Sequence, residues 1–336
     1  MARVGIVGVG RIGQMHARTL RSSPEVDELL VADAVPEHAR RLAAELDATA
    51  VDGVDELFGA GIDGLVVAAP TDAHADLVLR AVEAGVPVFC EKPLAGGIEQ
   101  SAKVARRIAE LGGRVHVGFQ RRFDAGYVAA REAVAEGRLG RVHTLRGLTA
   151  DPAPPPAAYI KTSGGIFRDC SVHDFDAIRW VTGREVVEVQ ATGSDRGADF
   201  FREYGDVDSA AAILRLDDDA LALVSATRYN GAGYDVRLEV HGSLGSLAAG
   251  FDDHLPLPSA EPGVDWPREQ PYGGFPERFR AAYIAELAAF TEFAAGKIDS
   301  PCTAEDSLEA LYVAEACERS RREQRPVRLA EVRANR

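Results

Sequence analysis

The sequence predicts an α/β protein whose N-terminal part is a doubly wound parallel sheet and whose C-terminal part adds a second, mostly antiparallel sheet. Three observations predict this class. Short apolar runs alternate with helical patterns up to about residue 120, which is typical of a parallel sheet with helical crossovers. A glycine-rich turn follows the first of these runs. Several closely spaced strand-like segments beyond residue 185 are separated by Gly and Asp turns.

The N-terminal elements follow from hydrophobic periodicity. Residues 3–9 (RVGIVGV) form a β-branched run that ends in glycines, which is typical of a buried parallel strand. Further strands are expected at 28–32, 64–68, 86–90 and 114–118, and helices at 11–22, 36–45, 73–83 and 98–111.

The pattern changes beyond residue 122. A proline cluster at 151–156 (DPAPPP) predicts a loop, and residues 252–276, rich in Pro, Gly and Asp, predict an exposed loop. Strands are expected at 142–148, 186–194, 207–217, 219–229, 234–241, 245–249 and 327–329, and helices at 127–136, 172–181, 277–295 and 304–321. We therefore predict two domains, residues 1–122 and 123–336. The length favours two domains as well, because a domain averages roughly 150 residues.

The composition excludes several classes of protein. The chain has 336 residues, and 38 Lys and Arg against 52 Asp and Glu give a formal net charge of −14. This charge argues against nucleic-acid and anionic-membrane partners, because both require a basic surface. The four cysteines form no metal-binding pattern, the N-terminus lacks the features of a signal peptide, and no uncharged run approaches the roughly 18 residues of a membrane helix. We expect a soluble cytoplasmic protein.

The glycine-rich turn predicts dinucleotide binding. Gly8, Gly10 and Gly13 fit the GxGxxG pattern between the first strand and the first helix, which is the context of a Rossmann fold. Gly8 permits the tight turn, Gly10 lets the backbone approach a pyrophosphate, and Gly13 allows close helix–strand packing. The amide groups of the helix N-terminus then favour phosphate. Arg11 either lies over the pyrophosphate or is a solvated helix residue.

Asp33 completes this pattern. It follows the second strand, about 20 residues after Gly13, where a carboxylate binds the ribose hydroxyls. Because a carboxylate repels the 2′-phosphate of NADP, Asp33 favours NAD. The alternative is an aspartate that caps a helix or a turn.

Lys92 follows the fourth strand in the segment Glu91-Lys92-Pro93 and is one of only four lysines. Ligands bind at the carboxyl ends of parallel strands, so Lys92 is expected to face the crevice. Its ammonium group can donate to a substrate hydroxyl there and help to withdraw the proton. The alternative is a surface lysine.

Asp169 and His173 form a second candidate cluster. They are four residues apart and share a face if the segment is helical. A carboxylate raises the basicity of a nearby imidazole, and such a pair can take a proton from an alcohol as hydride leaves. The alternatives are a capping aspartate beside a core histidine, and a metal site formed by Asp169, His173 and Asp176.

These segments together resemble the Gfo/Idh/MocA family (glucose–fructose oxidoreductase, inositol dehydrogenase, rhizopine catabolism). The residues that carry the resemblance are GVGRIG at 8–13, AAPTDAH at 68–74, EKP at 91–93, GFQRRFD at 118–124 and DCSVHD at 169–174. The resemblance spans nearly the whole chain. It implies a Rossmann domain followed by an α/β domain with a large open sheet. The outer face of that sheet commonly forms a dimer or tetramer interface, so we expect a homo-oligomer, foremost a homotetramer. A cis peptide bond before Pro93 is also implied.

The resemblance also implies roles for individual residues. His173 is the expected general base, Lys92 assists at the hydroxyl, and Asp169 orients the histidine. The expected cofactor-binding residues are Gly8, Gly10, Arg11, Ile12, Gly13, Asp33, Ala69, Thr71, His74, Glu91 and Lys92. The expected substrate-binding residues are Arg122, Asp151, Tyr229 and Tyr283, and no resident metal is expected. On the residues alone, His74 could equally be a core or capping residue and Arg122 a solvated one.

Within this family the chain looks most like the bacterial inositol 2-dehydrogenases, through GFQRRFDAGY, DPAPPPAAYI and SGGIFRDCSVHDFD. The expected reaction is therefore NAD-dependent oxidation of a ring secondary alcohol of a polyol, foremost myo-inositol, to the ketone (2-keto-myo-inositol, scyllo-inosose). Two alternatives stay open. One is an NAD(P)-dependent dehydrogenase of an aldose, glycoside or sugar nucleotide, and the other is a non-catalytic NAD-binding sensor.

Overall fold

The computed structural model describes residues 2–334, which fall into two compact units. The first unit comprises the chain up to Gln120 together with Ala281–Leu308. The second comprises Arg121–Arg280 and the chain from Glu309 onward. The second domain predicted from the sequence keeps residues 123–336 together, whereas residues 281–308 fall in the first unit.

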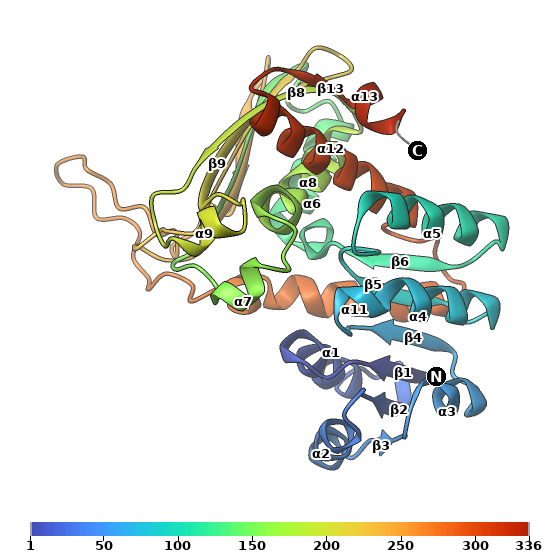
Figure 1. The fold of residues 1–336 in the computed structure, drawn as a ribbon. Coiled ribbons are helices and arrows are strands. Elements are labelled where there is room, and N and C mark those ends of the chain that lie inside the picture. The colour runs from blue at the N-terminus through green and yellow to red at the C-terminus, as the bar shows by residue number, and fades with distance from the viewer. Residues whose placement is uncertain (1, 335–336) are drawn as a thin grey trace. The chain divides into compact units, whose positions relative to one another are not determined.

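The first unit is built from alternating strands and helices (Figure 1). Its elements are β1 (Ala2–Val7), α1 (Arg11–Arg21), β2 (Val26–Ala32), α2 (Pro36–Leu46), β3 (Thr49–Ala50), α3 (Val54–Gly59), β4 (Gly64–Val67), α4 (Thr71–Glu83), β5 (Val88–Glu91), α5 (Ile98–Glu110), β6 (Val115–Gly118) and α11 (Arg280–Ala294). The short β3 and α3 are the elements of this unit that the sequence analysis missed.

All six strands of this unit run parallel in the order β3-β2-β1-β4-β5-β6. Residues of β4 and β6 are buried along their whole length, because helices cover both faces of the sheet. This order confirms the predicted doubly wound sheet. Its winding direction reverses between β1 and β4, which is where such sheets bind ligands.

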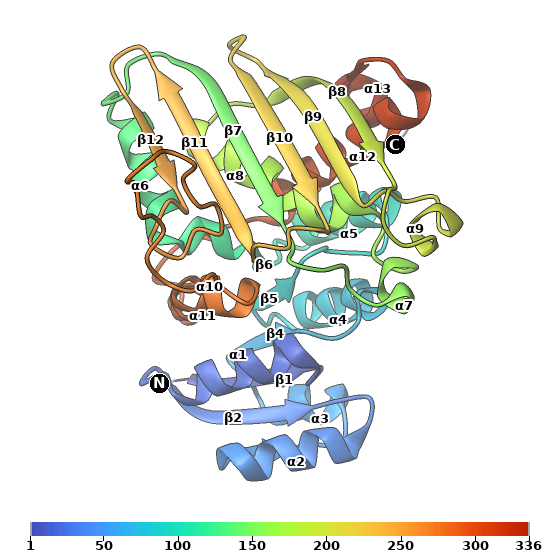
Figure 2. The same cartoon turned by 90° about the vertical axis from the view of Figure 1, so that its left-hand side faces the viewer.

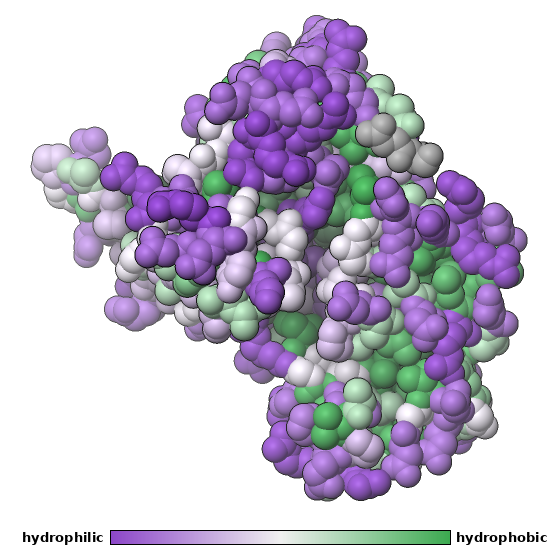
Figure 3. Space-filling model, in the orientation of Figure 1, coloured by the Kyte–Doolittle hydropathy of each residue, from purple (hydrophilic) through white to green (hydrophobic). Residues whose placement is uncertain are grey.

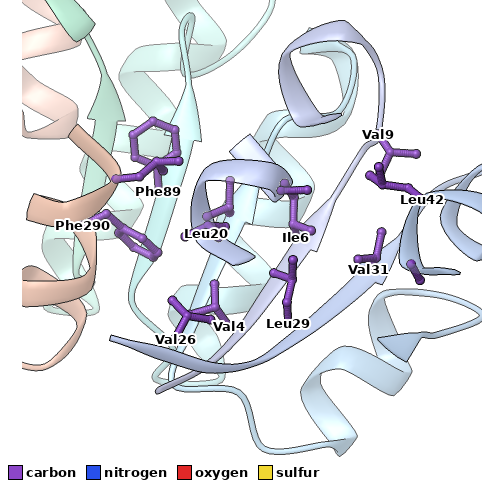
Figure 4. Packing of buried hydrophobic residues seen from close by; sticks show 14 of the residues in the cluster. Val4, Ile6, Val9, Leu20, Val26, Leu29, Val31, Leu42, Phe89 and Phe290 are labelled. Atoms are coloured by element: carbon purple, nitrogen blue, oxygen red, sulfur yellow. The ribbon is translucent and has the colours of Figure 1, made fainter. Parts of the chain in front are cut away.

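Helix α11 belongs to the first unit because its aromatic side chains complete that unit's core. Phe290 packs against Phe89 of β5 with ring centroids 5.8 Å apart in an edge-to-face arrangement, in the same buried cluster as Ile6 of β1 and Leu29 of β2 (Figure 4). A Cβ atom at Gly64 of β4 would lie 3.0 Å from the Phe290 ring, so this glycine leaves the space that the ring fills.

The second unit contains the larger sheet and the helices that cover it. Its elements are α6 (Ala125–Ala135), β7 (Val142–Ala150), α7 (Ala157–Ile160), the π-helical turn η2 (Phe167–Ser171), α8 (Val172–Thr182), β8 (Val186–Ser194), α9 (Phe200–Glu203), β9 (Ser209–Leu216), β10 (Leu221–Thr227), β11 (Asp235–Gly242), β12 (Ser246–Ala249), α10 (Phe275–Arg278), β13 (Val327–Arg328) and α13 (Leu329–Arg333). A 3-10 turn, η1 (Gln120–Phe123), and the long helix α12 (Ala304–Glu323) each cross a boundary between the two units.

The seven strands of this sheet run in the order β12-β11-β7-β10-β9-β8-β13. One pair, β7 and β10, is parallel and the other pairs are antiparallel, which confirms a mostly antiparallel sheet. Among the described residues, no helix crosses the face of β7, β9 and β10 that is turned to the viewer in Figure 2, and α6 and α8 lie behind the sheet. The sheet is therefore open on one side.

A long loop joins β12 to α10. Residues 250–274 contain no helix or strand, are mostly exposed, and project from the second unit (Figures 1 and 3), which confirms the predicted exposed loop. The helix expected at 277–295 is divided by Phe279 into α10 and α11. No helix within residues 2–334 is long and apolar enough to cross a membrane.

Candidate functional site

The turn between β1 and α1 requires glycine at two positions. Gly8 has φ +90°, and a Cβ atom there would lie 2.5 Å from the backbone of Ala69. A Cβ atom at Gly13 would lie 1.9 Å from the carbonyl oxygen of Gly8. At Gly10, by contrast, a Cβ atom would meet nothing within 4 Å in the described chain. Two glycines thus form the turn, and the third leaves open space beside it.

Helix α1 presents an N-terminus that suits a phosphate group. Within the described residues no side chain caps the helix at Gly10, and the first turn, which begins with Arg11 and Ile12, contains no acidic residue. The amide groups of a helix N-terminus lack intrahelical acceptors and favour anions. The turn and helix therefore fit the pyrophosphate of a dinucleotide.

Asp33 connects the glycine-rich turn to the end of β2. Its Oδ2 atom accepts a hydrogen bond from the Val9 amide (2.8 Å), and its Oδ1 atom accepts one from the Val35 amide (2.9 Å). The carboxylate stays partly exposed, and His38 Nδ1 lies 3.6 Å from Oδ1. Both the capping role and the ribose-binding role considered for Asp33 fit this geometry, because its oxygens retain further acceptor sites.

The remaining expected residues of the first unit follow β4 and β5. Ala69 and Thr71 form the turn into α4, and Glu91 and Lys92 stand at the end of β5. Because β1, β2, β4 and β5 are parallel, these residues gather at the same edge of the sheet as Gly8 and Asp33. The Lys92–Pro93 peptide bond is cis, as the resemblance implies.

Two side chains expected to bind the cofactor are used within the protein. Glu91 Oε1 lies 2.6 Å from Nε2 of the buried His16 on α1. His74 is also buried, with Nδ1 2.7 Å from the Pro93 carbonyl oxygen and Nε2 2.8 Å from the Ala69 carbonyl oxygen. The core role considered for His74 therefore accounts for both of its nitrogen atoms.

In the second unit, Asp169 lies in η2 and His173 in the first turn of α8. Asp169 Oδ2 accepts a hydrogen bond from Arg228 Nη2 (2.6 Å), and Asp169 Oδ1 accepts one from the Tyr159 hydroxyl (2.8 Å). A π-helical turn such as η2 is common at functional sites. The carboxylate of Asp169 is thus held from two directions.

Arg228 also brings Asp151 to Asp169. Its Nη1 atom donates to Asp151 Oδ2 at 2.9 Å. This follows from the sheet register: β7 and β10 end together at Ala150 and Thr227, so the next residues of both strands are adjacent. The structure therefore joins one expected catalytic residue and one expected substrate residue through a buried arginine.

Burial dominates the electrostatics of this cluster. It raises the pKa of the Asp151 carboxyl, while the charge and hydrogen bond of Arg228 act in the opposite direction. Burial and the neighbouring Asp169 carboxylate raise the pKa of Tyr159, so its hydroxyl stays protonated and donates to that carboxylate.

Three further residues expected to bind substrate have other partners within the protein. Arg122 is buried and bonds Asp176 through Nε (3.0 Å) and Nη2 (2.6 Å), which commits its guanidinium to an ion pair. The Tyr229 hydroxyl accepts from the Ala198 amide (3.0 Å). Tyr283 belongs to the first unit, where its ring lies edge-on to His16. A metal site formed by Asp169, His173 and Asp176 is not favoured either, because both carboxylates are already paired with arginines. Asp169 pairs with Arg228, and Asp176 with Arg122.

Sequence reasoning missed Arg228 and Tyr159. Arg228 lies 77 residues from Asp151 and 59 from Asp169. No local spacing connects these residues, and only the unexpected parallel pairing of β7 with β10 reveals the contact.

Comparison with known proteins now identifies the fold. Residues 2–119 match an oxidoreductase family with an NAD-binding Rossmann fold, and residues 127–248 match the GFO/IDH/MocA C-terminal domain. The chain belongs to the GFO/IDH/MocA oxidoreductase family. The first unit accordingly contains its NAD-binding Rossmann domain, which confirms the predicted cofactor.

Curated relatives cover nearly the full chain. A myo-inositol dehydrogenase of Streptomyces leeuwenhoekii is 42% identical over 94% of this chain and 96% of its own. The inositol 2-dehydrogenase of Rhizobium meliloti is 36% identical over 98% of this chain and 99% of its own.

Solved structures give the same result. A myo-inositol dehydrogenase of Corynebacterium glutamicum superposes with a TM-score of 0.89 at 38% identity, covering 97% of this chain and 98% of its own. A scyllo-inositol dehydrogenase of Lactobacillus casei, crystallised with NAD(H) and scyllo-inositol, gives a TM-score of 0.88 at 30% identity, covering 98% and 99%.

Proposed function

We propose that this protein oxidises a ring secondary alcohol of a polyol to the ketone with NAD, and that its substrate is myo-inositol, giving 2-keto-myo-inositol (scyllo-inosose). One observation carries the proposal: the Lys92, Asp169 and His173 pattern stands in a chain that matches inositol dehydrogenases along 94% or more of its length. We propose accordingly that the first unit binds NAD, and that the second unit binds the substrate and forms the oligomer.

Oxidising an alcohol to a ketone removes one hydride and one proton. Bound NAD supplies the hydride acceptor. The Lys92 ammonium group donates to the hydroxyl oxygen and stabilises the negative charge that develops on it. Gly8, Gly10, Gly13 and Asp33 would hold the cofactor at the same sheet edge that carries Lys92.

The second unit contributes the base. His173, neutral before the reaction, takes the hydroxyl proton. Asp169, four residues earlier in the chain, stabilises the imidazolium that forms, and Arg228 and Tyr159 hold its carboxylate by donating to it. Asp151, tied to the same arginine, accepts a hydrogen bond from a second ring hydroxyl of the polyol.

A substrate panel tests this proposal. Purified protein is supplied with myo-inositol, scyllo-inositol, glucose, xylose or a sugar nucleotide, each with NAD and with NADP, and the absorbance of the reduced cofactor is followed. We expect the highest kcat/KM with myo-inositol and NAD. A preference for an aldose or a sugar nucleotide would replace the substrate, and cofactor binding without turnover of any alcohol would favour the sensor.

Substitutions assign the roles. Lys92→Ala and His173→Ala should each lower kcat by roughly 10²–10⁴-fold, the range typical of general acid–base groups, with little change in NAD affinity. Lys103→Ala is the matched control, since Lys103 is a lysine of helix α5 outside the proposed site. Undiminished turnover in both Lys92→Ala and His173→Ala would contradict the assignment.

We propose further that the open face of the large sheet joins copies of this chain into a dimer or tetramer. The support is the apolar character of that face: Ile213, Leu221 and Leu223 are 50%, 41% and 45% exposed. Exposed apolar patches on sheets mark interaction surfaces.

Ile213→Glu combined with Leu223→Glu should reduce the particle mass measured by light scattering. Leu244→Glu, at an exposed turn between β11 and β12, is the control, and an unchanged mass in the double variant would contradict this interface.

We also propose that the protein is located in the cytoplasm. All four cysteines are buried and free of disulfides, which suits a reducing environment. Fractionation of cells that produce the protein, with a periplasmic marker as control, tests the location.

A further inference from the structure

We propose that His16 and His74 are positioning residues that brace the Glu91-Lys92-Pro93 turn from both sides and thereby fix the Lys92 ammonium group. The inference rests on the proposed function of Lys92. It gives His16 a role in the reaction and replaces cofactor contact as the role of His74.

His16 holds the residue before Lys92. Its Nε2 atom lies 2.6 Å from Glu91 Oε1, and because an ionised carboxylate only accepts, the imidazole donates. The ring lies edge-on to Phe89, with centroids 5.5 Å apart, and to Tyr283, 5.8 Å apart, so its orientation is fixed by packing. A Cβ atom at Gly118 would lie 3.3 Å from Glu91 Oε2, so the neighbouring strand leaves space for this carboxylate.

His74 holds the residue after Lys92. Its two nitrogens lie 2.7 Å from the Pro93 oxygen and 2.8 Å from the Ala69 oxygen. Carbonyl oxygens only accept, so each contact is a hydrogen bond when the ring nitrogen at that contact carries a proton. His74 therefore ties the turn after β4 to the turn that carries Lys92.

The two contacts matter because Lys92 stands between Glu91 and Pro93, the residues that they hold. The lysine side chain is a flexible four-carbon stem, so the position of its ammonium group depends on where the backbone starts. Displacing a reacting group by about 1 Å can cost roughly 10²-fold in rate. The histidines come from α1 and α4, the helices that follow β1 and β4 on either side of the point where the sheet reverses its winding. The same two elements therefore shape the cofactor edge and hold Lys92.

Conservative substitutions test the bond of His16 to Glu91 and separate the two bonds of His74. The amide nitrogen of glutamine stands near the position of histidine Nε2, and that of asparagine near Nδ1. His16→Gln should therefore keep the bond to Glu91, whereas His16→Phe keeps the ring packing and loses the bond. His74→Asn should keep the bond to Pro93, whereas His74→Gln keeps only the bond to Ala69.

We expect His16→Phe and His74→Gln to lower kcat for myo-inositol by roughly 10–10²-fold, with KM for NAD changed about threefold or less. His16→Gln and His74→Asn should recover most of this loss. The deuterium isotope effect on kcat, measured with inositol labelled at the reacting carbon, should rise in the two impaired variants, because a misplaced Lys92 slows the chemical step itself. His143→Gln, an exposed histidine of β7, is the control.

Several outcomes would contradict the proposal that His16 and His74 position Lys92. They are unchanged kcat in both impaired variants, equal losses in the Asn and Gln variants of His74, and losses that follow the melting temperature with no change in isotope effect. If the variants do not fold, the nitrogen-15 shifts of His74 in the unmodified protein decide for that residue, because an unprotonated Nδ1 atom could not donate to the Pro93 oxygen. Absence of inositol turnover by the unmodified protein would instead refute the proposed function, and the shifts of His74 would still report on its two bonds.

Discussion

The two units hold their polar groups by different means. In the first unit, main-chain atoms provide most of the partners. Asp33 accepts hydrogen bonds from two backbone amides, and His74 lies between two backbone carbonyl oxygens. Strand ends and tight turns therefore set the positions of these side chains.

In the second unit, side chains hold one another. Three buried arginines each bind buried or partly buried aspartates: Arg121 pairs with Asp174, Arg122 with Asp176, and Arg228 with both Asp151 and Asp169. A buried pair gives little net stability over an apolar replacement, but removing one partner leaves a buried charge uncompensated.

The two units should therefore respond differently to the loss of a single side chain. A site held by main-chain atoms tolerates the loss of a single side chain elsewhere, as long as the turns survive. A site held by buried ion pairs is lost when one arginine is replaced.

Arg228→Met should damage both stability and activity. It leaves Asp151 and Asp169 without their shared guanidinium, and breaking a buried pair in this way costs about 3–5 kcal/mol of unfolding free energy. We expect turnover of inositol to fall by at least about tenfold, while NAD affinity, a property of the first unit, stays the same. Urea unfolding and steady-state kinetics measure the two effects. Arg215→Met is the control, because Arg215 pairs with Asp219 on the exposed surface.

The same variant has a defined pH dependence. Burial raises the pKa of Asp151 and Arg228 lowers it, so removing Arg228 raises this pKa further. A carboxyl with a raised pKa favours the folded state at low pH, and this contribution is lost as the pH rises through the folded-state pKa. The stability deficit of Arg228→Met should therefore be largest near neutral pH and shrink on acidification. A deficit that grows toward acid pH would contradict this account.

Phe290→Ala tests whether α11 belongs to the first unit. Phe290 is fully buried against Phe89, and truncating a buried phenylalanine costs about 3–5 kcal/mol. Hydrogen exchange should accelerate in β1, β4 and β5 and much less in the second unit. Ile284→Ala on the same helix is the control, because Ile284 is 48% exposed. Faster exchange confined to the large sheet would contradict the assignment of this helix.

The contrast also explains what the sequence could predict. Gly13 and Asp33 follow the first two strands, where spacing alone indicates their chemistry, and the structure places them as that spacing predicts. The Arg228 contact with Asp151 depends on the parallel pairing of β7 with β10, although β8 and β9 lie between these two strands in the chain. The hydrophobic periodicity of a single sequence carries no information on which strands pair. The place of Phe290 in the first core depends equally on tertiary packing, since an apolar helix face does not show which sheet it will cover.

Glu331 offers the smallest effect and the sharpest contrast with the buried pairs. It lies on the surface of the second unit, where Arg325 donates to both of its oxygens and the Arg328 amide donates to Oε1. These bonds, the one with Arg325 foremost, lower the pKa of Glu331 to about 2. A lowered pKa means that the ionised form stabilises the fold above the ordinary value of 4.5, and that this contribution disappears as the pH falls through about 2. Glu331→Gln should therefore lower the urea midpoint slightly near neutral pH, and the difference from the parent protein should vanish on acidification. Glu305→Gln, in the first turn of α12, is the control. A midpoint loss comparable with that of Arg228→Met would break the comparison, because an exposed pair, screened by water, should contribute far less than a buried one.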